Sequence, residues 1–410
     1  MTSPKKICFF INWVRELDML ETLYENIDKN NFIFVINDLN KDFRSNKNDL
    51  LKIKSFLEVK KFDFFFLSKI LNKKKFDILV STGDLPISHF TFKNLAKFLY
   101  AQTIGYFFHL IKLKFLTKKY LNFDISANGR NANFYDNIYA ENQLSDHCIK
   151  FPNALDRNIK YFPDYRWKKV FNTYFTSSLM EQELINKKFL KKEIFYVGYP
   201  RFYKYHENNL KKSLISEFNL DIKKKNIICL PNERIMSYQD SNSLIEYVTF
   251  LEKLDKKYNL ILRPHPKLEY FNQKAFEILK SKKLKLDLNH ARKIIDLFEF
   301  ANLLICDFGS SIVESIYLKK KVIVYSWKNE ENFKLLNDAL NWSDNLIREK
   351  LYKINPKNTS SQKTAEQEIF NIISNKTYQK KINDISFEFF GDLKKINNPL
   401  EILKKKYDNI

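Results

Sequence analysis

The sequence predicts an α/β protein with two doubly wound domains that face each other across an interdomain cleft. Three observations predict this fold class. Short apolar runs alternate with helix-like segments over most of the 410 residues. The alternation restarts near residue 226, which indicates a second series of strands and helices. The apolar runs have no polar side, which is typical of strands buried within a parallel sheet.

The first series begins close to the N-terminus. Its expected strands are rich in Ile, Phe, Val and Tyr and lie at residues 6–12, 32–38, 76–84, 172–178 and 193–199. Helices are expected at 16–27, at 88–120 and between the last two strands. Residues 121–165 show little periodicity and are rich in Asn, Asp and Tyr, so loops are expected there. The lysine-rich residues 204–225 are expected to form a surface linker or helix.

The second series predicts strands at residues 226–233, 259–266, 284–288, 303–307 and 321–327, with helical patterns between them. Polar helices and loops are expected after these strands. The two series predict an N-terminal Rossmann-like domain over residues 1–215 and a C-terminal Rossmann-like domain over residues 216–345. A helical extension is expected over residues 346–410.

Residues 303–327 are the clearest single unit of the chain. An apolar run ends in Asp307, a Gly-Ser-Ser turn follows, and a helix-like segment leads into the apolar run KVIVYSW. The N–H groups and dipole of a helix N-terminus attract anions, and open α/β sheets hold ligands at the carboxyl ends of their strands. This unit therefore predicts a phosphorylated ligand at the turn between strand and helix.

The net charge of +22 has three physical interpretations beyond a solvated lysine-rich surface. These are a phosphorylated substrate, an anionic membrane surface and a nucleic acid. The sequence lacks an RNP-like aromatic pattern, zinc-finger spacing and a long arginine-rich tail, so nucleic-acid binding ranks last and no nucleic-acid partner is expected.

The four cysteines, Cys8, Cys148, Cys229 and Cys306, are far apart in the sequence and form no CxxC pair. Three of them lie in apolar, strand-like runs. This distribution favours buried free thiols in a reducing compartment over a zinc site or a disulfide framework.

Membrane-related features are sparse. The N-terminal apolar run is too short for a secretory signal, and no run of 18 apolar residues occurs. Residues 93–119 hold an aromatic segment flanked by lysines, which could lie in a membrane interface. A buried helix or helix pair is slightly favoured. The expected location is cytoplasmic, with peripheral contact at the inner face of the plasma membrane as the further expectation.

Two motifs at strand ends carry weaker functional predictions. In VGYPRF, residues 197–202, Gly198 and Pro200 shape a turn that presents Arg201. The alternative is an interdomain turn with a surface arginine, and the motif alone is weak evidence of function. In LPNER, residues 230–234, Asn232 follows a strand at the expected ligand edge, and an ordinary βα loop is an equal alternative.

Two further motifs carry stronger predictions. In LRPHPK, residues 262–267, two prolines fix His265 between Arg263 and Lys267, where it can contact a phosphate or move a proton near neutral pH. In the turn after Asp307, Gly309 allows close approach of a ligand, and Ser310 and Ser311 can cap the helix and donate to a phosphate. Glu314 lies one turn below Ser310 and can accept hydrogen bonds from ribose hydroxyls. Asp307 can instead orient the loop.

Together, these motifs resemble the CDP-glycerol glycerophosphotransferase family of teichoic-acid and capsule polymer synthesis. The resemblance rests on RPHP, on D-x-x-S-S-x-x-x-E about 40 residues later, and on G-x-P-R upstream, and it covers roughly residues 170–330. It implies a GT-B fold with two Rossmann-like domains, an N-terminal acceptor domain over residues 1–215 and a C-terminal nucleotide-donor domain over residues 216–345. It also implies that Ser310 and Ser311 contact the donor phosphates, Glu314 the ribose, and His265 the diphosphate. Arg201 would lie at the domain junction.

The chain departs from the family in its N-terminal domain. Family members often carry a His-Gly pair there whose histidine is thought to act as the base, and no such pair occurs in this sequence. The best-placed substitutes are Asp84, at the end of the strand FDILVSTGD, and His89, just after it. His109 lies in an apolar stretch and is expected to be structural.

The predicted function is a transferase of bacterial surface-glycan assembly. It would move glycerol phosphate or a sugar from a nucleotide-activated, CDP-glycerol-like donor to a hydroxyl on a glycan or lipid-linked acceptor. No cofactor and no metal are expected, because no DxD-type site is present. The alternatives are a GT-B glycosyltransferase with another nucleotide sugar, a nucleotide-sugar epimerase, and a non-enzymatic basic scaffold at a membrane surface.

Overall fold

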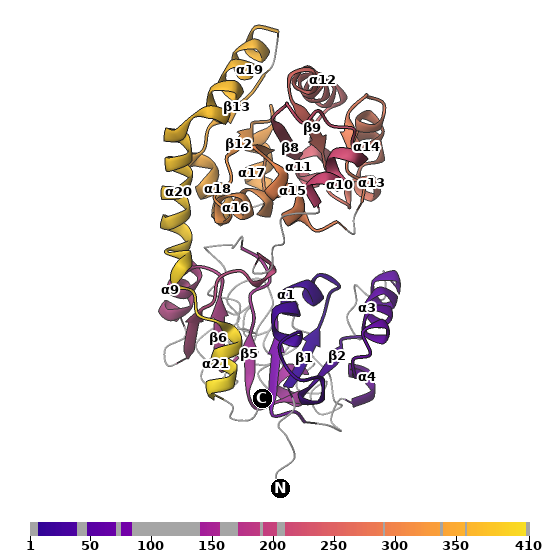
Figure 1. Cartoon of the computed structure of the whole chain (residues 1–410), viewed down its shortest axis with the longest axis vertical. Helices are drawn as coiled ribbons and strands as arrows, with labels where there is room; N and C mark the ends of the chain where they lie inside the picture. The colour runs from indigo at the N-terminus through magenta and orange to yellow at the C-terminus, as the bar shows by residue number, and fades with distance from the viewer. Residues whose placement is uncertain are drawn as a thin grey trace, which may run out of the picture. The chain divides into compact units, whose positions relative to one another are not determined.

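The computed structural model describes residues 7–38, 47–70, 75–83, 140–155, 171–188, 192–202, 210–289, 292–336, 339–356 and 359–406 (Figure 1). Asp84, His89, the helix expected at 88–120 and the segment 93–119 lie outside these ranges. The chain divides into two compact units. The first unit comprises Met1–Asn153, Tyr161–Tyr203 and Lys394–Ile410, and the second comprises Ala154–Lys160 and Lys204–Leu393.

The first unit is built on a parallel sheet in the order β3-β2-β1-β4-β5-β6-β7. Its strands are β1 (Ile7–Ile11), β2 (Phe32–Ile36), β3 (Phe64–Phe66), β4 (Ile78–Ser81), β5 (Cys148–Lys150), β6 (Thr173–Thr176) and β7 (Glu193–Tyr196). The strand order reverses between β1 and β4, which pair in parallel. Such a reversal opens a crevice at the carboxyl ends of the two strands.

The helices of the first unit are α1 (Arg15–Tyr24), α3 (Lys47–Val59), α4 (Leu67–Ile70), α8 (Ala140–Leu144), α9 (Leu179–Lys188) and α21 (Pro399–Lys406), with 3-10 turns η1 (Lys29–Asn31), η5 (Pro200–Phe202) and η7 (Leu393–Lys395). Continuous apolar sequence makes β1 and β2 buried along their whole length. Helix α21 belongs to the same core, because Leu403 is fully buried in one cluster with Ile7 and Phe9.

The second unit is built on a parallel sheet in the order β10-β9-β8-β11-β12-β13. Its strands are β8 (Asn226–Leu230), β9 (Asn259–Leu262), β10 (Lys285–Leu286), β11 (Leu303–Cys306), β12 (Val322–Tyr325) and β13 (Lys353–Ile354). Here the order reverses between β8 and β11, which again pair in parallel. The carboxyl ends of β8 and β11 therefore mark the expected ligand edge of this unit.

The helices of the second unit are α10 (Leu210–Glu217), α11 (Glu233–Ser237), α12 (Ser241–Lys257), α13 (Leu268–Phe271), α14 (Gln273–Lys280), α15 (Ile294–Phe300), α16 (Ser310–Tyr317), α17 (Glu330–Leu336), α18 (Ser343–Lys350), α19 (Thr359–Ser374) and α20 (Lys376–Phe390), with the 3-10 turn η6 (Ala339–Asn341). Helix α12 packs against α14, and α16 packs against α18 and α20 (Figure 1). The Tyr378 hydroxyl of α20 donates to the Val322 carbonyl oxygen at 2.6 Å, which ties this helix to β12.

Most predicted strands are present, and the differences have simple causes. Loops were expected over residues 121–165, and this is wrong for α8 and β5, because elements of 5 and 3 residues are too short to show periodicity. Strand β3 was missed for the same reason, with 3 residues. The four cysteines are buried and free, as expected. Residues 346–410 are shared between the two units.

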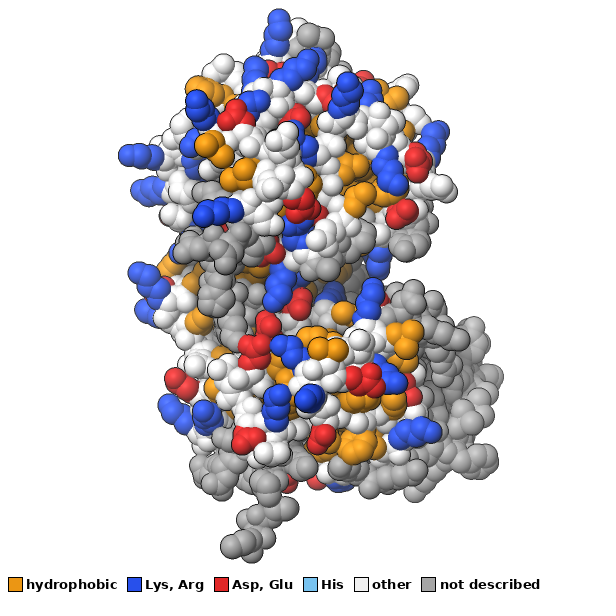
Figure 2. All heavy atoms as spheres, turned by 45° about the vertical axis from the view of Figure 1, so that its right-hand side comes forward, with side chains coloured by type: hydrophobic (Ala, Val, Ile, Leu, Met, Phe, Trp, Pro, Cys, Tyr) orange, Lys and Arg blue, Asp and Glu red, His pale blue; other side chains and the backbone are white. Residues whose placement is uncertain are grey.

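Charge and membrane features complete the description of the fold. On the face shown in Figure 2, Lys and Arg side chains are spread over both units and interspersed with Asp and Glu. This face therefore carries no single basic stripe. Within the described residues, none of the helices has both the length and the apolar character needed to cross a membrane.

The burial of α21 generates the first prediction. Leu403→Ala removes a fully buried side chain from the core of the first unit. The free energy of unfolding should fall by about 2–5 kcal/mol, as measured by urea denaturation. The matched control is Lys404→Ala on the exposed face of the same helix, which should leave stability near the wild-type value. Equal stability of both variants would contradict the placement of α21 in this core.

Candidate active site

Loops from four strands of the second unit meet at the carboxyl edge of its sheet. Asn232 follows β8, His265 follows β9, Asp307 follows β11 and Trp327 follows β12. All these strands are parallel, so their carboxyl ends share one edge. The Asn232 N–H donates to Asp307 Oδ1 at 2.8 Å, and Trp327 Nε1 donates to Asp307 Oδ2 at 2.8 Å. Asp307 thus joins the loops after β8, β11 and β12 at this edge.

The Asp307 carboxylate is the centre of this edge. It is 1% exposed and also accepts the Phe308 N–H at 2.7 Å. Burial raises the pKa of Asp307 to about 7, and the hydrogen bonds from Trp327, Phe308 and Asn232 act in the opposite direction. A carboxylate enclosed in this way orients loops. This agrees with the second interpretation of Asp307 and leaves it little capacity for direct contact with a donor.

Helix α18 holds the same turn from the other side. Arg348, fully buried, donates from Nε to the Asp307 carbonyl oxygen at 2.5 Å, and its guanidinium lies 3.6 Å from the centre of the Phe308 ring. Its Nη2 is 2.9 Å from Glu330 Oε2, which suits an ion pair although the atoms are not aligned as a hydrogen bond. Asp344 Oδ2 accepts the Gly309 N–H at 2.7 Å. These contacts fix the backbone that leads into α16.

Gly309 has a positive φ of 91°, and it is the residue that caps α16. A Cβ at this position would lie 3.0 Å from Asn232 Nδ2, so conformation and space both favour glycine. The expectation that Ser310 caps the helix is wrong. Ser310 is already the first helical residue, and no side chain caps α16.

The first turn of α16 has two backbone N–H groups that are available to an anion. Asp344 occupies the Gly309 N–H. Within the described part of the chain, the amides of Ser310 and Ser311 have no hydrogen-bond partner, and both residues are half-buried. The Asp344 carboxylate opposes anion binding at the N-cap, so an anion at this helix end would meet the amides of Ser310 and Ser311. Glu314 is buried on the same helix, 5% exposed.

His265 lies in an exposed loop between two prolines, as the sequence suggests. Its Nδ1 accepts the Lys267 N–H at 3.2 Å and lies 3.5 Å from Glu233 Oε2. The first contact requires an unprotonated Nδ1, whereas an ion pair with Glu233 requires a protonated one. The shorter contact meets hydrogen-bond geometry, so this conformation fits a neutral ring that carries its hydrogen on Nε2. A protonated ring would instead pair with Glu233.

Arg263 and Arg201 are placed differently from the other motif residues. Arg263 Nη1 donates to Asp287 Oδ2 at 3.0 Å, and Nη2 donates to the Arg292 carbonyl oxygen at 2.9 Å. Arg263 therefore anchors the loop after β10. Arg201 is half-buried in η5 of the first unit, just after Gly198 with its φ of 70°.

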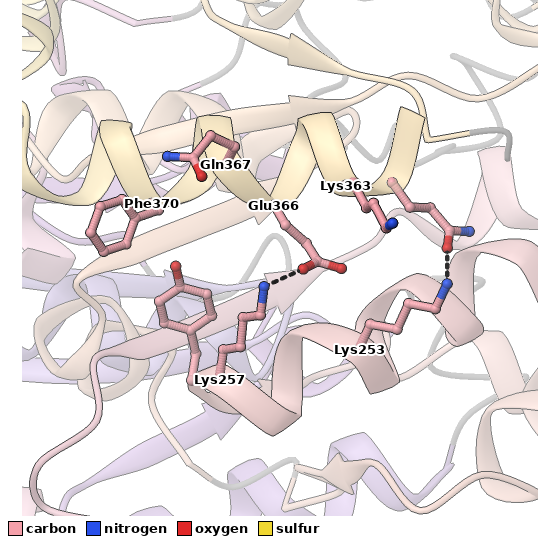
Figure 3. A pocket seen from close by; sticks show the side chains of 8 residues that line it. Lys253, Lys257, Lys363, Glu366, Gln367 and Phe370 are labelled. Atoms are coloured by element: carbon pink, nitrogen blue, oxygen red, sulfur yellow. Dashed lines mark hydrogen bonds and ion pairs between the residues drawn. The ribbon is translucent and has the colours of Figure 1, made fainter. Parts of the chain in front are cut away.

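The groove between α12 and α19 is distant from this chemistry (Figure 3). It is lined by Lys253, Lys257, Lys363 and Phe370, among others, and Lys257 Nζ pairs with Glu366 Oε2 at 2.5 Å. Helix α12 runs from the carboxyl edge of the sheet to its amino edge, where β9 begins. The groove lies at the amino edge, and the motif loops lie at the carboxyl edge.

Several residues of the site were missed by the sequence analysis. Trp327 lies two residues after the end of β12, and its position near a strand end would have identified it. Asp344 and Arg348 carry no such mark, because they lie 35 and 41 residues from their partners in the turn. Within the described residues, no group of three or more His, Cys, Asp or Glu side chains is arranged to hold a metal ion.

Comparison with known proteins finds a family model that matches part of the chain. The model of the family described as CDP-Glycerol:Poly(glycerophosphate) glycerophosphotransferase matches residues 159–334. The resemblance to the CDP-glycerol glycerophosphotransferase family is confirmed. The matched range contains every donor-site residue predicted from the sequence, and the prediction of a CDP-glycerol-type transferase is confirmed at the level of the family. No curated protein matches the chain in sequence.

Solved structures confirm the fold. A variant of the wall teichoic acid polymerase TagF soaked with CDPG superposes with a TM-score of 0.56 at 13% identity, covering 95% of this chain and 85% of that one. A co-structure of S. aureus MnaA with UDP gives a TM-score of 0.52 at 13% identity, covering 99% and 98%. The predicted GT-B architecture with two Rossmann-like sheets is thereby confirmed.

The buried carboxylate generates the second prediction. Asp307→Asn would replace one carboxylate oxygen by an amide nitrogen, which cannot accept a hydrogen bond. Because the two oxygens now accept three donors, at least one donor would lose its acceptor. The free energy of unfolding at pH 7 should fall by about 1–3 kcal/mol in urea denaturation. Asp240→Asn is the control, because asparagine caps a helix as well as aspartate and Asp240 caps α12. An unchanged Asp307→Asn protein would show that Asp307 does not hold these loops together.

Proposed function

We propose that this protein transfers glycerol phosphate from a CDP-glycerol-like donor to a hydroxyl of a glycan or lipid-linked polymer. One observation carries the proposal. The glycerophosphotransferase family pattern covers residues 159–334, which include all the motif loops that meet at the carboxyl edge of the second sheet. An edge of this kind, with a helix N-terminus and a cationic loop, suits a nucleoside diphosphate.

The donor would be held by the second unit. Its phosphates would accept hydrogen bonds from the Ser310 and Ser311 amides, close to the backbone at Gly309. Lys267, which is exposed, would add positive charge. Glu314 would accept hydrogen bonds from the ribose, and Asn232 would line the phosphate site, because its side chain lies against Gly309. Arg263 would support this site by holding the loop after β10, and Arg201 would contribute from the first unit.

His265 would act on the reacting phosphates. In the neutral ring that fits the observed contacts, Nε2 carries a hydrogen and can donate it to a phosphate oxygen. Charge grows on the leaving nucleotide as the phosphorus–oxygen bond breaks, and a positioned donor stabilises it. The acceptor hydroxyl would bind the first unit, where a base takes its proton. Peripheral contact with an anionic inner leaflet is part of the proposal, supported by the net charge of +22.

A nucleotide-sugar epimerase is the second candidate, favoured by the fold similarity to MnaA in complex with UDP. The two functions differ in their need for an acceptor. An epimerase converts its nucleotide sugar alone, whereas a glycerophosphotransferase releases CMP only when an acceptor is supplied. Acceptor-dependent release of CMP from CDP-glycerol therefore supports the proposal. Conversion of a nucleotide sugar without an acceptor would overturn it.

The third prediction concerns the donor site. His265→Ala should lower the rate of CMP release by about 100-fold or more, because a positioned proton donor contributes roughly 10²–10⁴ to rate. The double variant Ser310→Ala, Ser311→Ala tests the two serine hydroxyls at the same site. It keeps both amides and should weaken donor binding only modestly. Donor affinity is read from the thermal shift that CDP-glycerol induces.

The control for His265 is His147→Ala. His147 is exposed and lies just before β5, at the amino edge of the first sheet. This variant should keep the wild-type rate. A His265→Ala protein that folds, binds CDP-glycerol and turns it over normally would remove His265 from the reaction.

The fourth prediction concerns metal ions. We expect transfer without a bound metal, with the helix N-terminus and the basic loop in place of a cation. Addition of excess EDTA to protein purified in chelator should leave the rate of CMP release within about twofold of the untreated rate, which is a small change on the scale of catalytic effects. Loss of the rate with EDTA, restored by Mg²⁺ or Mn²⁺, would refute metal-independent transfer.

A further inference from the structure

A row of buried polar side chains follows the carboxyl edge of the first sheet. These side chains are at most 4% exposed and come from the ends of four neighbouring strands and from the helices beside them: Asn12, Glu16, Asn37, Ser81, Thr82, Glu141 and Lys150. Polar groups are rarely buried without a purpose, because each must find a hydrogen-bond partner. The row includes the reversal of strand order between β1 and β4, where open α/β sheets bind ligands.

Glu16 has a structural role in this row. Its carboxylate accepts the Asn12 N–H at 2.5 Å, the Trp13 N–H at 3.2 Å and the Thr82 hydroxyl. These contacts join the loops after β1 and β4 across the reversal. Both carboxylate oxygens of Glu16 therefore accept hydrogen bonds from within the protein.

Glu141, at the start of α8, differs from Glu16. It is 2% exposed, and the Ser81 hydroxyl bonds to its side chain, yet among the residues that the structure describes its Oε2 has no hydrogen-bond partner. The same is true of Asn37 Oδ1, in a side chain that is fully buried and donates from Nδ2 to Asn12 Oδ1 at 2.7 Å. Both unpaired atoms are hydrogen-bond acceptors. The ligand that would satisfy them carries O–H donors, which is the chemistry of a polyol or sugar.

The surroundings of Glu141 suit a base. Burial and, to a smaller extent, the Glu16 carboxylate raise the pKa of Glu141 to about 7, although the backbone N–H of Glu141, the Ser81 hydroxyl and the Lys150 ammonium act in the opposite direction. A general base works best with a pKa near the operating pH. The one histidine in the described part of the first unit, His147, lies at the opposite edge of the sheet.

We propose that this edge binds the terminal hydroxyls of the acceptor and that Glu141 takes the proton from the attacking hydroxyl. The inference rests on the proposed glycerophosphate transfer. The acceptor oxygen bonds to the phosphorus that carries glycerol, and the bond from that phosphorus to the bridging oxygen breaks. CMP leaves with the electron pair, and the proton passes to Glu141 and then to solvent. Glu141 thus takes the place expected for Asp84 or His89.

The test is a comparison of Glu141→Gln with the wild type, using CDP-glycerol as donor and a glycerol-terminated oligo(glycerol phosphate) as acceptor. We expect kcat to fall by about 100-fold or more, with the CDP-glycerol thermal shift unchanged, because the base acts only in proton transfer. The wild-type kcat should rise with pH up to about 7, where Glu141 ionises. The residual rate of Glu141→Gln should lose this rise.

The matched control is Glu181→Gln. Glu181 is another buried carboxylate of the first unit, but its Oε2 accepts both the N–H and the hydroxyl of Ser177 at 2.8 Å. Glutamine keeps one acceptor oxygen there, so kcat and its pH dependence should stay near the wild type. A purely structural role for buried carboxylates at this edge would instead lower both variants alike, and that result would overturn the inference.

Folding of the variant can be verified independently. The folded-state pKa of Glu141 lies above its ordinary value, so the stabilisation from this group is complete at low pH and is lost as pH rises through about 7. Glu141→Gln should therefore melt no lower than the wild type at pH 8. Glu141→Asp is the second variant: it retains the pH dependence and should lose at least 10-fold in kcat through misplacement of the carboxylate.

The outcomes separate the two proposals. If the wild type transfers glycerol phosphate and Glu141→Gln keeps a rate within threefold of it, the inference is wrong and the proposed function stands. If the wild type releases no CMP with any acceptor and shows no thermal shift with CDP-glycerol, the proposed function fails and the inference fails with it.

Discussion

The buried carboxylate of Asp307 is the interaction on which the geometry of the second unit depends. Three N–H donors from the loops after β8, β11 and β12 converge on its two oxygens. Burial of a charge without partners would be prohibitive, so the loops must close around it. Arg348 then holds the carbonyl of the same residue from α18. The direction in which the first turn of α16 presents its amides follows from this arrangement.

The first unit also has a parallel sheet with a reversal of strand order, but the carboxylates at its reversal differ in how their oxygens are used. There Glu16 joins the loops after β1 and β4, as Asp307 joins loops in the second unit. A further carboxylate, Glu141, has one oxygen without a hydrogen bond to any described residue. The contrast is physical. A carboxylate with all its donors inside the protein fixes a backbone, whereas one with an unused oxygen and a pKa near 7 can exchange a proton with a ligand.

The sequence predicts the parallel sheets and the donor edge because both depend on local patterns. Continuous apolar runs such as residues 303–306 define strands. A glycine such as Gly309 marks a position of positive φ, which other residue types rarely adopt. The prediction that Ser310 caps α16 is wrong because the helix begins one residue earlier than expected, so that Gly309 occupies the N-cap position. Contacts such as Gly309 with Asp344 join residues 35 apart. No local pattern reports such a pair, because only the folded chain brings them together.

The family match includes the residues expected to face the donor but not the residues that hold them in place. The matched range ends at residue 334, before α18 begins at Ser343. The residues expected to face the donor lie inside the match, whereas Asp344 and Arg348, which hold the turn at Gly309, lie beyond it. Asp344 also places a negative charge at the N-cap of α16, where an anion would otherwise be most favoured. In the proposed donor site, this charge would direct a phosphate to the amides of Ser310 and Ser311, one step further along the helix. A side chain outside the family pattern would then set where the donor can bind.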